Sequence, residues 1–390
     1  MSIAAAQSIC ILMHDFSAGG TERIAIRLGN RWAASGRTVT IVCGSSAGVL
    51  RELVDRAVTV IELAPALVRG LRSRHRLGVR MAPIVAQLHP DIVFIPGNFH
   101  IPVVSPLLAN LPRPWPSIVV KLSNPIQRDS RSTVGQWLFE SRLRQRLRDS
   151  CCVVAMAPVL AAELSARTGY QQVISIQEPI LDDDLPACAP MPPSTALVAA
   201  GRLVPQKNFQ LAIRAVAKLR DPSVQLTIYG EGPQRAELRA LALQLGIAER
   251  IHLPGYARDF QCSVLPRHRL FLLSSVFEGY PAVAVEALAA GLPVISTDCS
   301  LAIRDIVSRP ELGTVLAQAD AEQLAAAIDA RLKMPGADAD WIAAQVQQHR
   351  IGPIAQQYLA LFDRLALSRT SGQAPTTASP SLHAPPLAPS

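Results

Sequence analysis

The strongest constraint on the fold is a regular alternation of short apolar segments with longer helical segments, which runs through both halves of the chain. Strands are predicted at 8–13, 38–42, 58–63, 91–95, 117–122 and 151–155, with helices at 21–35, 71–88 and 134–148 between them. The second half repeats the pattern from a strand at 197–200 to a helix at 321–330. Such alternation predicts parallel sheets that are covered by helices on both faces. We therefore expect an α/β protein of two doubly wound, Rossmann-like domains that face a central cleft.

The chain length and a proline-rich segment predict where these domains divide. With 390 residues, of which 49% are hydrophobic, the chain can build two cores of ordinary size. Residues 179–193 contain five prolines and three consecutive aspartates, a composition typical of a linker. We expect a first domain at 1–180, a linker at 181–193 and a second domain at 194–352. The tail at 368–390 is rich in Ser, Thr, Pro and Ala, and is expected to be disordered.

One segment of the second half, 277–295, combines two carboxylates with a helix start. Pro281 suits the first helical position and Gly291 the position just past the last turn, so Glu278 precedes the helix and Glu286 lies inside it. The free N–H groups at a helix start favour a phosphate group. The helix is apolar on nearly every side of Glu286, and a buried carboxylate needs a partner. The segment therefore predicts a ligand site rather than two solvated acids.

Three further motifs occur at predicted strand ends, at Gly201–Asn208 (GRLVPQKN), Leu226–Pro233 (LTIYGEGP) and Ile251–Tyr256 (IHLPGY). Together with 277–295, their order and spacing resemble the retaining glycosyltransferases of family 4, which have the GT-B fold and an E-x7-E signature. The resemblance covers about residues 196–300 well and the first half more loosely. It implies an N-terminal acceptor-binding domain, a C-terminal nucleotide-sugar-binding domain, and a last helix, at 353–367, that crosses back to the first domain.

The resemblance also implies a role for each charged residue of the second half. Arg202 and Lys207 would neutralise the charge that develops on the departing nucleoside diphosphate, so that neither a metal nor a cofactor is required. Glu278 would contact the transferred sugar or stabilise positive charge on it. Glu286 would accept hydrogen bonds from the two ribose hydroxyls of the donor.

Loops and glycines complete the predicted donor site. Gly19 and Gly20 follow the first strand and open a helix, where paired glycines let a phosphate approach the backbone. The resemblance identifies this as the glycine loop, facing the donor diphosphate and the acceptor. The remaining donor contacts would come from the backbone at Gly279 and Tyr280, from the turn at Gly230, and from the region of His252, against which the base would lie.

The first domain departs from the family at its catalytic histidine. Relatives often carry a His directly after the strand that corresponds to 91–95, whereas this chain places Asn98 and His100 a few residues later. His100 is the candidate catalytic residue and Asn98 the other polar candidate. A surface loop histidine is an equally good interpretation. Gln177-Glu178-Pro179 also stands where the family often has Asn-Pro.

Charge and hydropathy restrict the partners. The net charge is +8, and arginines concentrate at 68–80 and 142–148. These segments could attach to an anionic membrane surface or form solvated helix faces, whereas the low aromatic content (5%) argues against nucleic acid. No apolar run reaches the 18–20 residues of a membrane span, and no signal-peptide pattern is present. We expect a cytoplasmic protein, and leave open peripheral attachment to the inner face of the cell membrane.

The function that follows is transfer of a sugar from a UDP- or GDP-sugar donor to an acceptor hydroxyl, with retention. The basic first domain favours a lipid-linked oligosaccharide or another envelope or exopolysaccharide precursor as the acceptor. The displaced histidine keeps a second hypothesis open, a catalytically weak GT-B protein that acts as a sugar-nucleotide sensor or as the partner of another transferase. The lack of G-x-G-x-x-G in the first strand–helix turn argues against a dinucleotide oxidoreductase.

Overall fold

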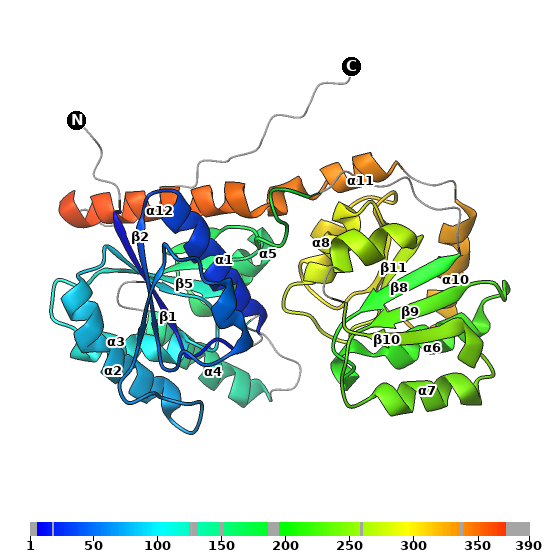
Figure 1. Ribbon diagram of the computed structural model, residues 1–390, viewed down its shortest axis with the longest axis horizontal. Helices are drawn as coiled ribbons and strands as arrows, with labels where there is room; N and C mark the ends of the chain where they lie inside the picture. Colours follow the sequence, from blue (N-terminus) through cyan, green and yellow to red (C-terminus); the bar gives the residue numbers. More distant parts are fainter. Residues whose placement is uncertain are drawn as a thin grey trace, which may run out of the picture. The chain divides into compact units, whose positions relative to one another are not determined.

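The computed structural model describes residues 6–17, 19–124, 126, 132–147, 151–185, 195–257, 260–334 and 338–371. The described residues form two compact units (Figure 1). Unit 1 comprises those up to Ile176 together with those from Gln357 onward, and unit 2 comprises Gln177–Gln356. No helix in the described ranges is both long enough and apolar enough to span a membrane.

Unit 1 is built on a parallel sheet in the order β3-β2-β1-β4-β5-β6-β7. Its strands are β1 (Ser8–Met13), β2 (Thr38–Cys43), β3 (Thr59–Glu62), β4 (Ile92–Ile95), β5 (Ser117–Leu122), β6 (Cys151–Ala155) and β7 (Val173–Ser175). Its helices are α1 (Gly20–Ala34), α2 (Ser73–Leu88), α3 (Val104–Asn110), α4 (Thr133–Leu147) and α5 (Pro158–Thr168). The central strands are buried and almost wholly apolar, as expected for strands covered on both faces.

The last helix, α12 (Ile351–Ser371), begins in unit 2 and from Gln357 onward belongs to unit 1. Tyr358 and Phe362 pack edge-on against Trp32 of α1, at 5.7 and 5.0 Å between ring centroids. The Arg37 guanidinium pairs with the Asp363 carboxylate at 3.0 Å. An aromatic cluster and an ion pair therefore join the C-terminal helix to the first half of the chain.

The observed helix corrects the expected bounds of 353–367, because α12 starts two residues earlier and continues to Ser371. Its end is held by tertiary contacts that a composition pattern does not reveal. Arg369 pairs with the Asp91 carboxylate at 3.5 Å and donates to the Trp115 carbonyl at 3.5 Å. Residues 368–371 are thus helical, and the rest of the expected tail, 372–390, lies outside the described residues.

Unit 2 contains a second parallel sheet, in the order β10-β9-β8-β11-β12-β13. Its strands are β8 (Ala196–Ala200), β9 (Gln225–Tyr229), β10 (Ile251–Gly255), β11 (Leu270–Leu273), β12 (Val294–Thr297) and β13 (Gly313–Leu316). Its helices are α6 (Phe209–Lys218), α7 (Arg235–Gln244), α8 (Ala282–Ala289), α9 (Ile303–Ile306), α10 (Ala321–Lys333) and α11 (Ala339–Ala344). The predicted pair of doubly wound parallel sheets is confirmed.

The first residues of the expected linker are held in place within unit 2. Leu181 forms a β-bridge with Arg350, and the Gly352 N–H donates to the Asp183 carboxylate at 2.8 Å. The Arg350 guanidinium also donates to the Asp183 carbonyl. Residues 181–185 are therefore anchored beside the start of α12, while 186–194 lie outside the described residues.

Candidate functional site

In each sheet the strand order reverses at one position, and the predicted site residues lie on loops beside that position. In unit 2 the strand order reverses between β8 and β11, and in unit 1 between β1 and β4. Loops at the carboxyl ends of two such strands diverge to opposite faces of the sheet and leave room for a ligand. The loops that follow β8 and β11 contain Lys207 and Glu278, and the loops that follow β1 and β4 contain Gly19 and His100.

Lys207 and Glu278 form a close, largely buried pair in unit 2. The Lys207 ammonium donates to Glu278 Oε1 at 2.5 Å, and the Ser275 hydroxyl donates to the same oxygen at 2.5 Å. The side chains of Lys207 and Glu278 are only 15% and 10% exposed. Within the described part of the chain, Glu278 Oε2 accepts no hydrogen bond. The carboxylate is thus oriented through one oxygen and can accept a ligand donor at the other.

Three further hydrogen bonds hold the two loops together around this pair. Gln206 Nε2 donates to the Phe277 carbonyl and the Val276 N–H donates to the Gln206 carbonyl, both at 2.8 Å. The Ser274 hydroxyl donates to the Lys207 carbonyl at 2.9 Å. Two motifs that are 71 residues apart therefore form one rigid surface.

The other charged residues predicted in unit 2 are more accessible. Arg202 is exposed and its guanidinium contacts no described acid. Glu286 lies in α8 and is partly buried, so its carboxylate is less enclosed than its apolar neighbours suggested. Gly279 lies on the loop just before α8, which begins at Ala282 with Pro281 as its N-cap, one residue later than predicted.

Tyr280 packs beside His349, with 5.9 Å between the ring centroids. Burial, followed by the nearby Glu178 and Asp305 carboxylates, raises the pKa of the Tyr280 hydroxyl. His349 precedes α12, and its carbonyl accepts hydrogen bonds from the Ile180 and Leu181 N–H groups. The ring of Tyr280 therefore contacts the segment where the chain leaves unit 2.

Gly230 is required for the close contact of two loops. Its φ is +134°, and a Cβ atom at this position would lie 1.9 Å from the Gly201 carbonyl oxygen. The Gly230 N–H donates to the Gly255 carbonyl at 2.8 Å, so this turn contacts the end of β10. The His252 side chain is not part of this contact. It is exposed, and its Nε2 lies 3.3 Å from the Gln225 side chain at the beginning of β9.

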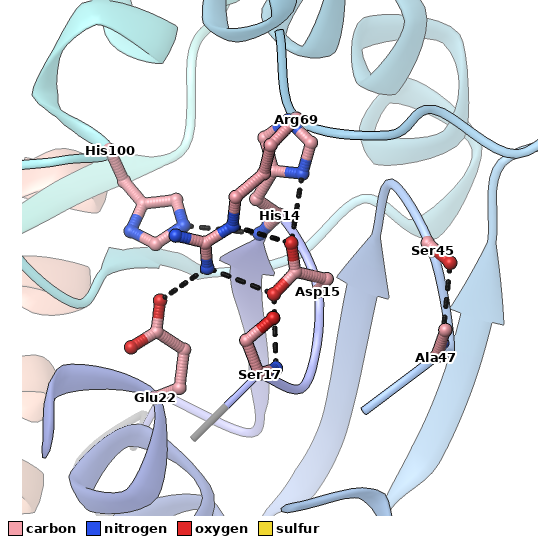
Figure 2. A network of polar contacts seen from close by, with 8 residues as sticks. All are labelled: His14, Asp15, Ser17, Glu22, Ser45, Ala47, Arg69 and His100. Carbon is pink, nitrogen blue, oxygen red and sulfur yellow. Dashed lines mark hydrogen bonds and ion pairs between the residues drawn. The ribbon is translucent and has the colours of Figure 1, made fainter. Parts of the chain in front are cut away.

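In unit 1 the loop after β1 forms a charged network with Arg69 (Figure 2). Arg69 Nε and Nη2 bind the two oxygens of Asp15 at 2.5 and 2.9 Å, and Nη2 also donates to Glu22 Oε1 at 2.9 Å. Burial alone would raise the pKa of the Asp15 carboxyl, but hydrogen bonds from Arg69 and Ser17 lower it to about 2. Asp15 is therefore ionised at neutral pH, and the bidentate pair is fixed.

The glycine loop itself accommodates a carboxylate of the protein. Gly19 is the N-cap of α1, and a Cβ atom there would lie 2.1 Å from Glu22 Oε2. A Cβ atom on Gly20 would meet nothing within 4 Å. Gly19 thus provides space for Glu22 at the helix start, and part of the positive helix end is already offset by that acid.

His100 is completely buried beneath the ring of Phe99, whose centroid lies 5.1 Å from that of the imidazole. Its Nε2 accepts a hydrogen bond from the His14 backbone N–H at 3.0 Å. Burial lowers the pKa of His100 to about 3, so the imidazole is neutral. Asn98 Oδ1 accepts from the Ser123 N–H at 2.6 Å. Both candidates for the family histidine therefore support the loops of unit 1.

The part of the chain that contains the Lys207–Glu278 pair matches a known protein family. Residues 192–348 match the family model of glycosyl transferases group 1. Arg202, Gly230 and Glu286 lie inside this range. The glycine loop and His100 lie outside it.

One curated relative and two solved structures are similar to this chain. The chain is 32% identical over 162 residues to the lipopolysaccharide core biosynthesis glycosyltransferase LpsE of Rhizobium meliloti, a match that covers 38% of this chain and 45% of LpsE. The apo form of the lipopolysaccharide outer core galactosyltransferase WaaB has a TM-score of 0.69 at 17% identity, over 93% of this chain and 99% of WaaB. Anabaena HepE in complex with UDP and glucose has a TM-score of 0.66 at 15% identity, over 94% of this chain and all of HepE. The predicted GT-B fold is thereby confirmed.

Sequence reasoning did not identify Ser275, His14 and the Arg69 network as parts of the sites. Asp15 and Glu22 flank the two glycines, which was an available signal, but their partner is about fifty residues away in the chain. Arg69 lies in the basic segment 68–80, and its ion pairs with Asp15 and Glu22 make it part of this network. Among the described residues, no group of three or more His, Cys, Asp or Glu side chains is arranged to hold a metal ion.

Proposed function

We propose that the protein is a glycosyltransferase that moves a sugar from a nucleotide-sugar donor to an acceptor hydroxyl, with retention of configuration. The observation that carries the proposal is the Lys207–Glu278 pair beside the switch point of unit 2. A cation placed for a phosphate and a carboxylate with one free oxygen are the two groups that a nucleoside diphosphate sugar requires at its reacting end.

In the proposed reaction the diphosphate binds at Arg202 and Lys207, and Glu278 Oε2 accepts a hydrogen bond from a hydroxyl of the transferred sugar. The acceptor oxygen attacks the anomeric carbon from the face that the leaving group occupies. The bond between that carbon and the phosphate oxygen breaks, its electron pair stays on the phosphate, and the acceptor proton moves to the same phosphate oxygen. Glu286 binds the ribose hydroxyls. The chain supplies charge and orientation and forms no covalent intermediate.

The resemblance to family 4 supports the finer features of this proposal, namely retention, independence of metal ions, and no cofactor beyond the nucleotide-sugar substrate. The acceptor is proposed to be a lipid-linked oligosaccharide or another envelope or exopolysaccharide precursor at the cytoplasmic face of the membrane. The names of LpsE and WaaB, both of which refer to lipopolysaccharide, support this class of acceptor.

One observation favours a second candidate function, a GT-B protein with weak catalysis that senses sugar nucleotides or assists another transferase. His100 is wholly buried and accepts a hydrogen bond from the His14 N–H, so its imidazole is not accessible from the surface of unit 1. A protein of this second kind would bind the donor and transfer sugar weakly. Its turnover alone would distinguish it from the enzyme of the first proposal.

A donor panel tests the proposal. The melting temperature of the full chain is measured with saturating UDP-, GDP- and ADP-sugars. Binding to the native state at 100 times Kd stabilises a protein by about 2.7 kcal/mol, so the cognate donor is expected to raise the melting temperature clearly. Release of free nucleotide with an envelope glycan acceptor then separates an enzyme from a sensor. Absence of a shift with every donor contradicts both candidates.

We expect Arg202→Ala and Glu286→Gln to differ in their kinetics. Arg202 meets charge that develops as the glycosidic bond breaks, so its loss lowers kcat and kcat/KM together, by about 10-fold or more. Glu286 binds ribose equally in the ground and transition states, so its loss raises KM with little effect on kcat. Steady-state kinetics on both variants provide the check. Arg239→Ala and Glu249→Gln, at exposed positions of unit 2, are the matched controls. Parental kinetics in either variant rule out the role proposed for that residue.

We expect sugar transfer to continue in excess EDTA, because the cations of Arg202 and Lys207 replace a divalent ion at the diphosphate. The measurement compares initial rates with EDTA, with added Mg²⁺ and with added Mn²⁺. Loss of activity that either ion restores would show that the reaction needs a metal.

We expect salt-sensitive binding to anionic vesicles through the exposed arginines of unit 1. Arg72, Arg76 and Arg144 are exposed, and Leu71 and Trp137 nearby in the chain are 92% and 65% exposed. Each basic residue near an anionic surface contributes about 1 kcal/mol, and the attraction decays within a Debye length. Co-sedimentation at low and raised salt, with the triple Gln variant of these arginines, provides the check. If the protein pellets equally with neutral and anionic vesicles, or with neither kind, the arginines form only a solvated face.

A further inference from the structure

The half-buried ring of Phe99 in unit 1 has two arginines packed on it. The guanidinium carbon of Arg69 lies 4.7 Å from the ring centroid, and that of Arg74 lies 5.2 Å from it. We propose that Arg69 and Arg74, on this ring, bind a phosphate group carried by the acceptor. The acceptor role rests on the proposed function, whereas the anion site follows from the contacts of unit 1 alone.

Arg69 is already oriented for a ligand. Its Nε and Nη2 atoms are occupied by Asp15 and Glu22, whereas Nη1 donates to no described residue. A guanidinium fixed at one edge presents its remaining N–H groups in a defined direction, so little side-chain entropy is lost on binding. Because its side chain is 40% exposed, a ligand can reach the free edge.

Arg74 provides charge that the protein itself does not neutralise. It lies in the first turn of α2, and no carboxylate among the described residues pairs with it. Burial, and after it the nearby Arg74 and Arg142, lowers the pKa of Arg146 in α4. Arg74 of α2 is therefore near enough to Arg146 of α4 for the two charges to repel, and a bound anion would relieve this repulsion.

The surroundings of Phe99 favour an anion over a neutral group. The His14 and His100 rings contact Phe99 and are wholly buried, and burial lowers the pKa of both, so they stay neutral. The two nearby carboxylates, Asp15 and Glu22, are both bound by Arg69. The free donors at the Phe99 ring are therefore those of the arginines.

The position and the charge indicate the class of ligand. The loops after β1 and β4 flank the switch point of unit 1, the place where a doubly wound sheet binds its ligand. Two arginines lie on one ring, and their forks match the geometry of phosphate oxygens. The phosphate could belong to a phosphorylated glycan or to the diphosphate of a lipid-linked glycan.

The experiment is isothermal titration of the full chain with inorganic pyrophosphate. The Arg202→Gln variant serves as the background because it removes a cation of the proposed donor site. Arg74→Gln is added to this background, and Arg56→Gln, at an exposed position of unit 1, is the matched control. We chose Arg74 rather than Arg69 because Arg69 also holds the glycine loop. Pyrophosphate is expected to bind the background and the control alike and to bind at least about 10-fold more weakly after Arg74→Gln, since a hydrogen bond to a charged group contributes about 1.5–3 kcal/mol.

Equal affinity in the Arg74→Gln and Arg56→Gln proteins, or no binding to the background, overturns the anion site. Titration with glucose 6-phosphate distinguishes the two sources. Tighter binding of pyrophosphate supports a diphosphate-linked acceptor, and tighter binding of glucose 6-phosphate supports a phosphorylated glycan. The Arg74→Gln single variant should keep the melting shift with nucleotide sugars. If the parent protein shows no such shift, the proposed function fails while the pyrophosphate comparison still decides the anion site.

Discussion

Glu278→Gln is expected to reduce the rate of sugar transfer on the order of 100- to 1000-fold, the range seen when one preorganised charge-stabilising group is lost from an active site. The substitution keeps the size of the side chain and removes its charge. The side chain at 278 then no longer neutralises the Lys207 ammonium. It also no longer places a negative charge beside the transferred sugar. Initial rates at saturating donor, measured with the Glu249→Gln control, provide the test. A parental rate in Glu278→Gln would falsify the placement of this carboxylate at the reacting sugar.

Stability must be measured on the same variant, because the pair is mostly buried. Removing one partner of a buried ion pair typically costs 3–5 kcal/mol, since the other charge is left uncompensated. Ser275→Ala removes one hydrogen bond to the same oxygen and keeps the charge, so it is expected to cost only about 1 kcal/mol. Loss of transfer in Glu278→Gln without loss of folding, together with near-parental transfer in Ser275→Ala, would identify the charge as the essential property.

Trp32→Ala is expected to have a large effect on stability, about 3–5 kcal/mol for unit 1. Trp32 is wholly buried and contacts Phe94 of the sheet as well as Tyr358 and Phe362 of α12. Its loss leaves a large cavity at the point where α12 joins the first half of the chain. The unfolding free energy is measured by urea denaturation, with near-ultraviolet circular dichroism as the probe.

The exposed Trp137 in α4 provides the matched control for this prediction. It is 65% exposed, so Trp137→Ala is expected to change the free energy of unfolding by no more than about 0.5 kcal/mol. Equal effects of the two substitutions would mean that the aromatic cluster does not carry the attachment of α12 to unit 1.

Several elements were predictable residue by residue. The predicted strands at 8–13, 117–122 and 151–155 coincide with β1, β5 and β6. Gly291 has a φ of +77° just past the end of α8, as the sequence indicated. These features depend on local properties, namely the period of apolar residues and the backbone freedom of glycine, and both can be read along the chain.

Other elements were missed or misplaced because tertiary contacts decide them. The sequence does not predict the helices α3 and α5, although both contribute buried residues to the core of unit 1. The last turn of α12 was assigned to a disordered tail, yet Arg369 is held by Asp91, a residue 278 positions away. Composition describes the average behaviour of a segment and contains no information on such distant partners.

The candidate site also combines features that the sequence predicts with features that depend on tertiary contacts. The sequence alone determined two doubly wound sheets and the motifs at their strand ends, because hydrophobic periodicity and turn residues act over a few positions. Only the tertiary structure decided that Lys207 binds Glu278, that Arg69 pairs with an acid of the glycine loop and that His100 is buried. Each of these contacts depends on strand order, which places loops side by side that are 50 to 90 residues apart in the chain. An ion pair can form and an imidazole can become buried only after the strands have taken this order.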